Sequence, residues 1–471
     1  MHDGSFMTET DAFSWRMEVD PELRSTVIAV AWLDSAPDWD RLTDKLDRAV
    51  RQIPVFCRRA VDIPGRVAPP RWAPPEDFDL SWHLRRVAAP PPATDEVVLD
   101  LTRVAAMAGF DRSRPLWEFT LVEGLEAGRA ALIMKMHHAL ADGIGDVELG
   151  LLLFESTPEG VAPGRRLPVP LGRAPGAVAL LGEAVAHDSR RVGRMAATAL
   201  NSAVPTARRA VEHPFATARD VVGMATSIGR TVAPVSSTRS PCMTARGSGR
   251  RLHMMTVPTD RLKAAAAALE GTLNDAFMTS VTGGLRLYHE LHEAPVDELL
   301  VTLPISTRTA EDPAAGNRIT LQRFSVPVGI TNVTERAQAL GDKCRQARAE
   351  RSLHHANAIA GVLNRLPVGA IGSMLKHVDF VASNVPGFPG PMYLAGARIS
   401  GIFPFGPTIG AALNVTLFSY AEICCIGVTV DTSAVPDHGR LADCLEQGFA
   451  EVLALVPAPA SDPTAVPASL G

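Results

Sequence analysis

The spacing of hydrophobic and polar residues over the first 160 positions predicts a mixture of strands and helices. The apolar stretch 25–33 has the composition of a strand, and 38–53 has the period of an amphipathic helix. Two further apolar runs, 114–125 and 129–140, are separated only by Glu-Ala-Gly, so we predict an antiparallel hairpin. The run 146–155 has the length and apolar density of a helix.

A second region of strands and helices extends from about residue 250 to residue 455. The pattern predicts a strand over 299–306 and another over 378–387 that ends in a turn. It also predicts two strands within 412–431, joined by a short turn.

The same region contains three predicted helices. One begins within 272–278, and another covers 334–353 with Thr334 as its N-cap. A closing helix is predicted over 439–455.

The composition changes between these two regions. Residues 165–239 contain eleven arginines, no lysine and four acidic residues, a local charge of +7 that leaves −12 for the rest of a chain whose total is −5. Basic pairs lie at 190–191 and 208–209, and 190–204 is typical of a weakly amphipathic helix. One interpretation is a solvated helical crossover between two lobes. The other is a surface for anionic lipid headgroups, where each basic side chain contributes about 1 kcal/mol.

Overall composition excludes several classes of protein. The 471 residues are 46% hydrophobic and 21% charged, which is ordinary for a globular protein of two or three domains. The net charge of −5 gives no reason to expect a nucleic-acid partner. No uncharged apolar run is long enough to span a bilayer, and the first fifteen residues do not resemble a signal peptide.

Six cysteines are scattered without the spacing of a zinc site, so we expect no metal and reduced, mostly buried thiols in a cytosolic protein. Cys424 and Cys425 are neighbours in a predicted strand, where they should face opposite sides.

The stretch 135–145 contains two adjacent histidines followed by Asp-Gly. If His137 and His138 end a strand, their side chains point to opposite faces, which disfavours a shared metal ion. A purely structural pair at a strand end is the simplest alternative. However, HHxxxDG should arise by chance in only about one chain in a thousand of this composition. A neutral imidazole near pH 7 suits removal of a proton from an alcohol during acyl transfer.

HHxxxDG resembles the signature of the CoA-dependent acyltransferase superfamily, which includes chloramphenicol acetyltransferase and peptide-synthetase condensation domains. Four other motifs occur with it, and together the five resemble the bacterial wax ester synthase/diacylglycerol acyltransferase family over nearly the whole chain. These motifs are RPLWEFTLVEGL at 114–125, Asn-Asp at 274–275, PISTR at 304–308 and SNVPGFPGP at 383–391, and the stretch LAGARISGIFPFGPTIGAALNVTLFSY at 394–420 follows them.

The resemblance implies an α/β (α+β) fold of two chloramphenicol-acetyltransferase-like lobes with mixed sheets and an active-site channel between them. We expect the first lobe at 1–164, the basic helical crossover at 165–245 and the second lobe at 246–456. The Pro/Ala-rich tail 457–471 should be disordered.

The resemblance also implies the activity and the roles of residues in the HHxxxDG motif. The enzyme would transfer a long-chain acyl group from acyl-CoA, a co-substrate, to diacylglycerol or a fatty alcohol, without a resident cofactor. His138 would be the general base, supported by His137. Asp142 would be a structural acid, with Arg308 as its partner by analogy with the superfamily, and Gly143 would permit the bend that follows.

Four residues in the other motifs have suggested roles. Asn274 either donates to the developing oxyanion or caps its helix. Trp117 is expected to pack behind the histidine strand. Asn384 and Gly387 are expected in a structural turn that lines the channel.

Two other functions remain open at this stage. One is a catalytically weak protein that binds lipid or coats lipid droplets, although such a protein has no need of a general base. The other is an acyltransferase with a different acceptor. For the leading hypothesis, we expect a cytoplasmic protein associated peripherally with the inner face of the plasma membrane or with lipid droplets.

Overall fold

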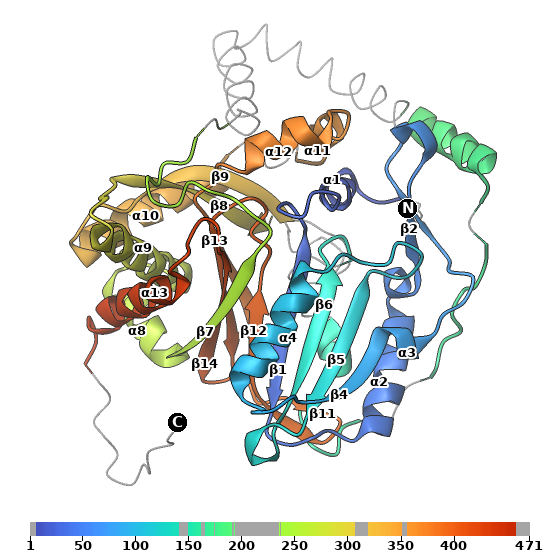
Figure 1. The fold of residues 1–471 in the computed structure, drawn as a ribbon, viewed down its shortest axis with the longest axis horizontal. Coiled ribbons are helices and arrows are strands. Elements are labelled where there is room, and N and C mark those ends of the chain that lie inside the picture. Colours follow the sequence, from blue (N-terminus) through green and yellow to red (C-terminus); the bar gives the residue numbers. More distant parts are fainter. Residues whose placement is uncertain are drawn as a thin grey trace, which may run out of the picture.

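The computed structural model of the chain describes residues 6–140, 149–161, 165–173, 175–190, 193, 235, 237–306, 319–350 and 356–457. Two six-stranded sheets form the centres of two lobes, and each sheet carries helices on its outer side (Figure 1). A separate two-stranded sheet pairs β2 (Arg59–Val61) with β3 (Arg71–Ala73).

The first sheet has the strand order β11-β12-β1-β6-β5-β4. It is mixed, because β4 runs parallel to β5 while the other described pairs are antiparallel. Its strands are β1 (Thr26–Leu33), β4 (Leu84–Ala88), β5 (Trp117–Glu123), β6 (Ala130–His137), β11 (Tyr393–Leu394) and β12 (Ala397–Phe405). The strand predicted over 25–33 and the hairpin predicted from 114–125 and 129–140 are therefore confirmed.

The second sheet has the order β7-β14-β13-β10-β8-β9. It is also mixed, with β10 parallel to both β13 and β8. Its strands are β7 (Arg250–Pro258), β8 (Glu298–Ser306), β9 (Ile319–Pro327), β10 (Phe380–Phe388), β13 (Leu413–Tyr420) and β14 (Ile423–Asp431). Two mixed sheets in two lobes confirm the expected fold class.

The strands are not assigned to the two sheets in chain order. β11 and β12 follow β10 in the sequence, but β12 pairs with β1 of the first sheet. The chain then returns to the second sheet at β13. Part of the range expected for the second lobe thus completes the sheet of the first, so the two lobes are joined through their strands.

Helices cover the outer sides of both sheets. In Figure 1, α8, α9, α10 and α13 lie outside the second sheet, whereas α2 and α3 flank the first. The main helices are α1 (Glu9–Met17), α2 (Trp39–Gln52), α3 (Leu80–His83), α4 (Asp95–Met107), α8 (Thr259–Ala268), α9 (Leu273–Leu291), α10 (Val333–Arg348), α11 (Ala356–Leu363), α12 (Val368–Leu375) and α13 (His438–Leu453). Short 3₁₀ helices occupy η1 (Pro54–Cys57), η2 (Pro64–Arg66) and η3 (Glu126–Gly128).

The helices predicted over 38–53 and 439–455 correspond to α2 and α13, and the helix beginning within 272–278 is α9. Residues 149–153 and 177–190 are also helical. Glycines allow α9 and α13 to cross closely, because a Cβ atom on Gly284 would lie 2.6 Å from the Leu445 Cα. No helix among the described residues is both long and apolar enough to cross a membrane.

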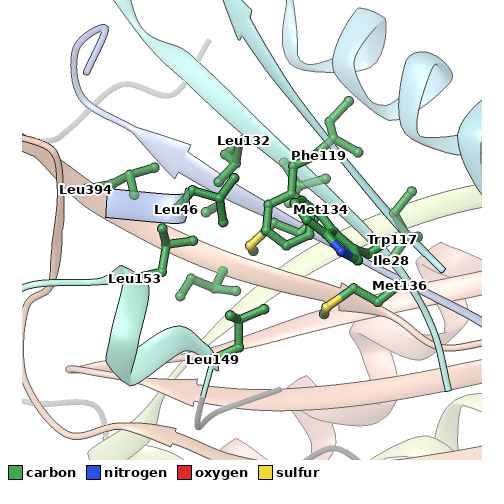
Figure 2. Close-up of a cluster of buried hydrophobic side chains, with 14 of the residues drawn as sticks. Ile28, Leu46, Trp117, Phe119, Leu132, Met134, Met136, Leu149, Leu153 and Leu394 are labelled. Atoms are coloured by element: carbon green, nitrogen blue, oxygen red, sulfur yellow. The ribbon is translucent and has the colours of Figure 1, made fainter. Parts of the chain in front are cut away.

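Two hydrophobic cores lie on opposite sides of the second sheet. Cys424 belongs to the core shared with α8, α9 and α13, and Cys425 belongs to the core of the first lobe. The prediction that these neighbours face opposite sides is confirmed. All six cysteines are free thiols, and only Cys242 is not fully buried. Figure 2 shows part of the first core around β6, with Leu149 and Leu153 of the 149–153 helix beside Met134 and Met136.

Two local predictions were wrong. The N-cap of α10 is Asn332 rather than Thr334, because the Asn332 side chain accepts hydrogen bonds from the backbone N–H groups of Thr334 and Glu335. The strand predicted to end in a turn at Gly387 instead continues as β10 to Phe388, with a register shift after Val385. The Gly387 N–H donates to Ser419 Oγ (3.0 Å), which holds this irregular part of the strand against β13.

Parts of several predicted segments lie outside the described residues. These are 141–148 of the stretch after the histidines, most of 191–234 in the basic crossover, 307–308 of the PISTR motif, 351–353 of the helix predicted over 334–353, and the tail from 458.

Candidate active site

The two adjacent histidines lie at the end of β6, at the centre of the first sheet. His137 is the last residue of the strand and is fully buried, whereas His138 begins a turn and is partly exposed. The His138 N–H donates to the Ser25 carbonyl oxygen (2.9 Å), and the Leu140 N–H donates to the His137 carbonyl oxygen (2.9 Å). Backbone hydrogen bonds therefore hold the turn on both sides of His138.

His138 faces a cavity between the two sheets. The cavity holds about 1150 Å³ of empty space, counting the part that is open to solvent. Met134, Met136 and His138 line it at every second position of β6, as expected for one face of a strand. The opposite wall comes from the second sheet through alternate residues of two paired strands: Val381, Ser383 and Val385 of β10, and Asn414, Thr416 and Phe418 of β13.

The cavity is mainly apolar, with few polar side chains. Besides His138, the wall contains Ser383, Asn414 and Thr416. Thr416 Oγ1 donates to Asn414 Oδ1 (2.8 Å), and Asn414 Nδ2 donates to the Pro407 carbonyl oxygen (2.8 Å). Aliphatic chains fit such a lining, while the polar groups supply a small number of hydrogen-bonding positions.

His137 points away from the cavity into a buried polar pocket. Its Nδ1 accepts a hydrogen bond from the Ala139 N–H (3.0 Å), so the neutral ring carries its proton on Nε2. That Nε2 lies 3.4 Å from Glu18 Oε2. The edges of Trp15 and Phe110 face the ring, with centroid distances of 5.6 and 6.0 Å.

Glu18 connects the two sides of this histidine turn. The same Oε2 atom that faces His137 accepts a hydrogen bond from the Ser25 N–H (3.1 Å). The Ser25 carbonyl oxygen in turn accepts the His138 N–H. Arg24 lies 3.7 Å from Glu18 Oε1. One buried carboxylate thus contacts His137 and orients the residue that holds the backbone of His138.

Trp117 lies on β5, beside the histidine strand β6 in the same sheet, with its side chain on the face that Met136 occupies. It is fully buried and lies opposite Met136 in the pairing of β5 with β6. Its Nε1–H donates to the Phe56 carbonyl oxygen (2.9 Å), and its ring stacks on His83. These contacts give Trp117 a packing role.

Asn274 is the second residue of α9 and does not cap the helix. Thr272 is the N-cap and forms a reciprocal capping box with Asp275. Asn274 is absent from the described lining of the cavity, although its buried Nδ2 atom has no hydrogen-bond partner among the described residues.

The SNVPG motif contributes to the cavity through residues other than the two that were predicted. Ser383 and Val385 line it, whereas Asn384, between them on β10, is not among the described lining residues. Gly387 is close to β13, where a side chain would collide with Phe418, 2.5 Å from its ring. Asp142, Gly143 and Arg308 lie outside the described residues.

Sequence reasoning missed four residues of this site: Glu18, Ser383, Asn414 and Thr416. Asn414 and Thr416 carry a detectable signal, because they are polar at alternate positions of an otherwise apolar strand. Glu18 has no comparable local pattern.

The two histidines point to opposite sides of β6, which agrees with the argument that they do not share a metal ion. Within the described ranges, no group of three or more metal-ligating side chains occurs.

Comparison with known proteins identifies the family of this chain. Residues 7–277 match the wax ester synthase/diacylglycerol acyltransferase catalytic domain, and residues 315–452 match the C-terminal domain of the same family. A putative diacylglycerol O-acyltransferase of Mycobacterium tuberculosis strain H37Rv is 36% identical over 467 residues, which cover 98% of this chain and 93% of that protein. This chain belongs to the wax ester synthase/diacylglycerol acyltransferase family. It is an acyltransferase.

Solved structures share the fold of this family member. The wax ester synthase/diacylglycerol acyltransferase from Marinobacter aquaeolei VT8 aligns with a TM-score of 0.62 at 22% identity, covering 95% of this chain and 98% of that one. The first condensation domain of the calcium-dependent antibiotic synthetase aligns with a TM-score of 0.59 at 14% identity, covering 95% of both chains. At these identities the likeness concerns the two-lobed fold.

Proposed function

We propose that the enzyme transfers a long-chain acyl group from acyl-CoA to the hydroxyl of diacylglycerol or of a long-chain alcohol. The observation that carries this proposal is the position of His138, on the wall of a large apolar cavity between the two sheets. Aliphatic chains fit the cavity, and the histidine supplies a base beside them.

In this reaction His138 acts as the general base. Its imidazole takes the proton from the acceptor hydroxyl as the hydroxyl oxygen attacks the thioester carbonyl carbon. The carbon–sulfur bond then breaks, and the leaving thiolate takes the proton from the imidazolium to give free CoA. No acyl-enzyme is required, because the hydroxyl attacks directly.

The buried residues behind β6 support this base. His137 and Glu18 hold the turn through the contacts described above, so that His138 keeps one orientation toward the cavity. The roles of Asp142 and Arg308 as a structural pair, and of Asn274 as an oxyanion donor, rest on the family resemblance alone. The Ser383 hydroxyl, on the cavity wall, can form a hydrogen bond with a polar group of the substrate.

The products and the acceptor suggest a location. Diacylglycerol, fatty alcohols and their esters are apolar, so we propose that the enzyme works in peripheral association with the inner face of the plasma membrane or with lipid droplets. Acyl-CoA reaches the site from the cytoplasm in this scheme.

A direct test supplies the purified enzyme with labelled palmitoyl-CoA and, in parallel reactions, detergent-dispersed diacylglycerol and hexadecanol. We expect labelled triacylglycerol, wax ester or both, with CoA released in equal amount. Release of neither ester with either acceptor would exclude the proposal. If label were found instead in another alcohol when a mixture of acceptors is offered, the acceptor assignment would be wrong.

A further inference from the structure

Two helical segments lie along the upper edge of the molecule in Figure 1: the helix 177–190, drawn in green, and α11 with the residues that follow it. Both border one shallow surface hollow, whose roughly 240 Å³ of empty space includes the part that is open to solvent. Asp188 comes from the first segment, and Gly361 and Arg365 from the second. The hollow thus brings together parts of the chain that are far apart in sequence.

Three arginines line this hollow, and we call them the arginine cluster: Arg16, Arg66 and Arg365. None of them forms an ion pair within 4.0 Å to a carboxylate of the described residues. Arg16 donates to the Asn364 carbonyl oxygen, and Arg365 donates to the Gly361 carbonyl oxygen (2.6 Å). Burial and then the positive charge of Arg66 lower the pKa of Arg16, while the negative charges of Glu9 and Asp62 act in the opposite direction without forming an ion pair with it.

Two acidic residues also border the hollow, and they do not neutralise the cluster through ion pairs. The Glu9 carboxylate accepts a hydrogen bond from Asn364 Nδ2 (2.9 Å). Asp188 lies at the rim. Because guanidinium groups match phosphate oxygens in geometry and charge, three such groups without carboxylate partners suit a phosphate.

Both segments that border the hollow carry exposed apolar side chains. On the helix 177–190, Val178 and Val185 are 86% and 62% exposed, and Leu181 lies on the same side of the helix. The opposite side attaches the helix to the protein, where Leu180 and Ala184 pack against Ile63 and Ala68. The exposed residues therefore have no role in holding this helix in place.

The second segment and the turn next to the hollow continue this apolar surface. Val362 of α11 is 65% exposed, and Leu366 and Val67 are also exposed. Large apolar side chains around a basic centre are typical of a surface that enters the headgroup region of a membrane.

α12 links the segment that carries part of this surface to the wall of the active-site cavity. Ile409 lines the cavity, and the next residue, Gly410, approaches the α12 backbone so closely that a Cβ atom would lie 3.1 Å from the Leu375 carbonyl carbon. α12 in turn packs with α11 and α1 through a small core that includes Ile371 and Leu23. The surface and the cavity wall are thus connected through α12 and its packing with α11.

We propose that this face docks on an anionic membrane, with the phosphate of a lipid headgroup bound by the arginine cluster and the exposed valines and leucines inserted among the acyl chains. The proposal deepens the proposed function, on which it rests, by naming the surface that meets the lipid phase.

The main test measures co-sedimentation with vesicles of phosphatidylcholine alone or with phosphatidylglycerol added. We expect the wild type to prefer the anionic vesicles and the double variant R66Q/R365Q to bind them roughly thirtyfold more weakly, since each basic group contributes a few-fold in affinity. The matched control is R348Q/R440Q, which removes two exposed arginines of α10 and α13 and should leave binding unchanged. Equal binding by wild type and R66Q/R365Q would overturn the proposal.

A second pair of variants tests the apolar contribution. V178S/V185S should weaken binding to both kinds of vesicle, whereas V104S/V161S, which changes two exposed valines elsewhere, should not. If V178S/V185S and V104S/V161S lost vesicle binding equally, this face would not be the one that enters the membrane.

Activity on detergent-dispersed substrates separates this proposal from its alternatives. R66Q/R365Q should keep the wild-type KM for acyl-CoA and its unfolding temperature. A raised KM would assign the arginines to the phosphates of soluble acyl-CoA and overturn the membrane assignment. A change in oligomeric state on size-exclusion chromatography would assign the face to a second copy of the chain. Failure of the proposed function appears differently, as absence of ester product while vesicle binding persists.

Discussion

The two faces of strand β6 differ sharply, although their residues alternate along one short segment. Met134, Met136 and His138 face the cavity, where the surroundings are mostly apolar. Lys135 and His137 face the other way, into a buried polar region with Glu18 and Glu118. The first face is arranged for substrate, and the second is arranged to hold the strand end.

The contrast shows how one histidine faces the substrate cavity while its neighbour is enclosed in the protein. His137 is enclosed by two aromatic rings, a carboxylate and a backbone N–H. Lys135 is 2% exposed, lies 3.7 Å from Glu118 Oε1 and stands over the Phe110 ring. Buried charges without partners are costly, so these contacts are needed for the polar face to exist at all.

The largest expected effect comes from the cavity face. His138→Ala should lower kcat by about 10²- to 10⁴-fold, which is the usual contribution of a general base. The unfolding temperature should change little, because His138 is partly exposed at the end of its strand. The measurement is ester formation with palmitoyl-CoA in detergent. Activity above about a tenth of wild type would show that another group removes the proton.

Changes on the polar face should lower kcat by altering the orientation of His138 toward the cavity. Glu18→Ala removes the acceptor of the Ser25 N–H and the partner of His137, so we expect kcat to fall by up to about a hundredfold with KM little changed. Glu18→Gln keeps an oxygen acceptor and should recover much of the loss. If E18Q were as impaired as E18A, with both folded normally, the hydrogen bond to Ser25 would not be the reason.

A larger side chain on the cavity face should reduce the transfer of long acyl groups more than the transfer of short ones. Met134→Trp adds volume to the cavity wall and should reduce transfer of a palmitoyl group by about tenfold, with a smaller loss for a butyryl group. Met134→Leu, which nearly keeps the volume, is the matched control. Equal losses for both acyl groups would mean that Met134 does not border the bound chains.

The smallest expected effect is on the free energy of unfolding at high pH, through Lys135 on the polar face. Burial lowers the pKa of Lys135 below its ordinary value of 10.5. In the pH range just below 10.5, the unfolded chain then binds a proton that the folded protein has released, so the free energy of unfolding rises with pH. Lys135→Met removes this contribution.

Urea unfolding from about pH 8 to about pH 10.5 checks this sign. The wild type should gain stability relative to K135M as the pH rises. Lys263→Met, at an exposed position of α8, controls for general effects of charge. A wild type that lost stability relative to K135M over this range would contradict the direction of the pKa change.

Much of the fold could be predicted because its signals are local. The β5–β6 hairpin follows from two apolar runs and a short connection, and α2 follows from its helical period. The pairing of β12 with β1 could not be predicted, since strands 360 residues or more apart meet through tertiary packing. The end of β10 was also missed, because Pro-Gly normally marks a turn and here the chain continues through a register shift.

The candidate site was predictable only where a motif marked it. HHxxxDG identified His138, and strand alternation was enough to separate it from His137. Asn274 and Asn384 were selected from motifs, yet the described cavity wall is formed instead by Ser383, Asn414 and Thr416. Their participation depends on which face of β10 and β13 meets the first sheet.

The sequence by itself determined the family, the alternation that gives two adjacent histidines opposite surroundings, and the main local elements. Tertiary structure alone decided which distant residues complete the site. Glu18 reaches His137 because the chain after α1 lies beside the end of β6, and the cavity exists because two separate sheets face each other. Local sequence determines backbone period and side-chain direction, but distances between separate segments are determined by the packing of the whole chain.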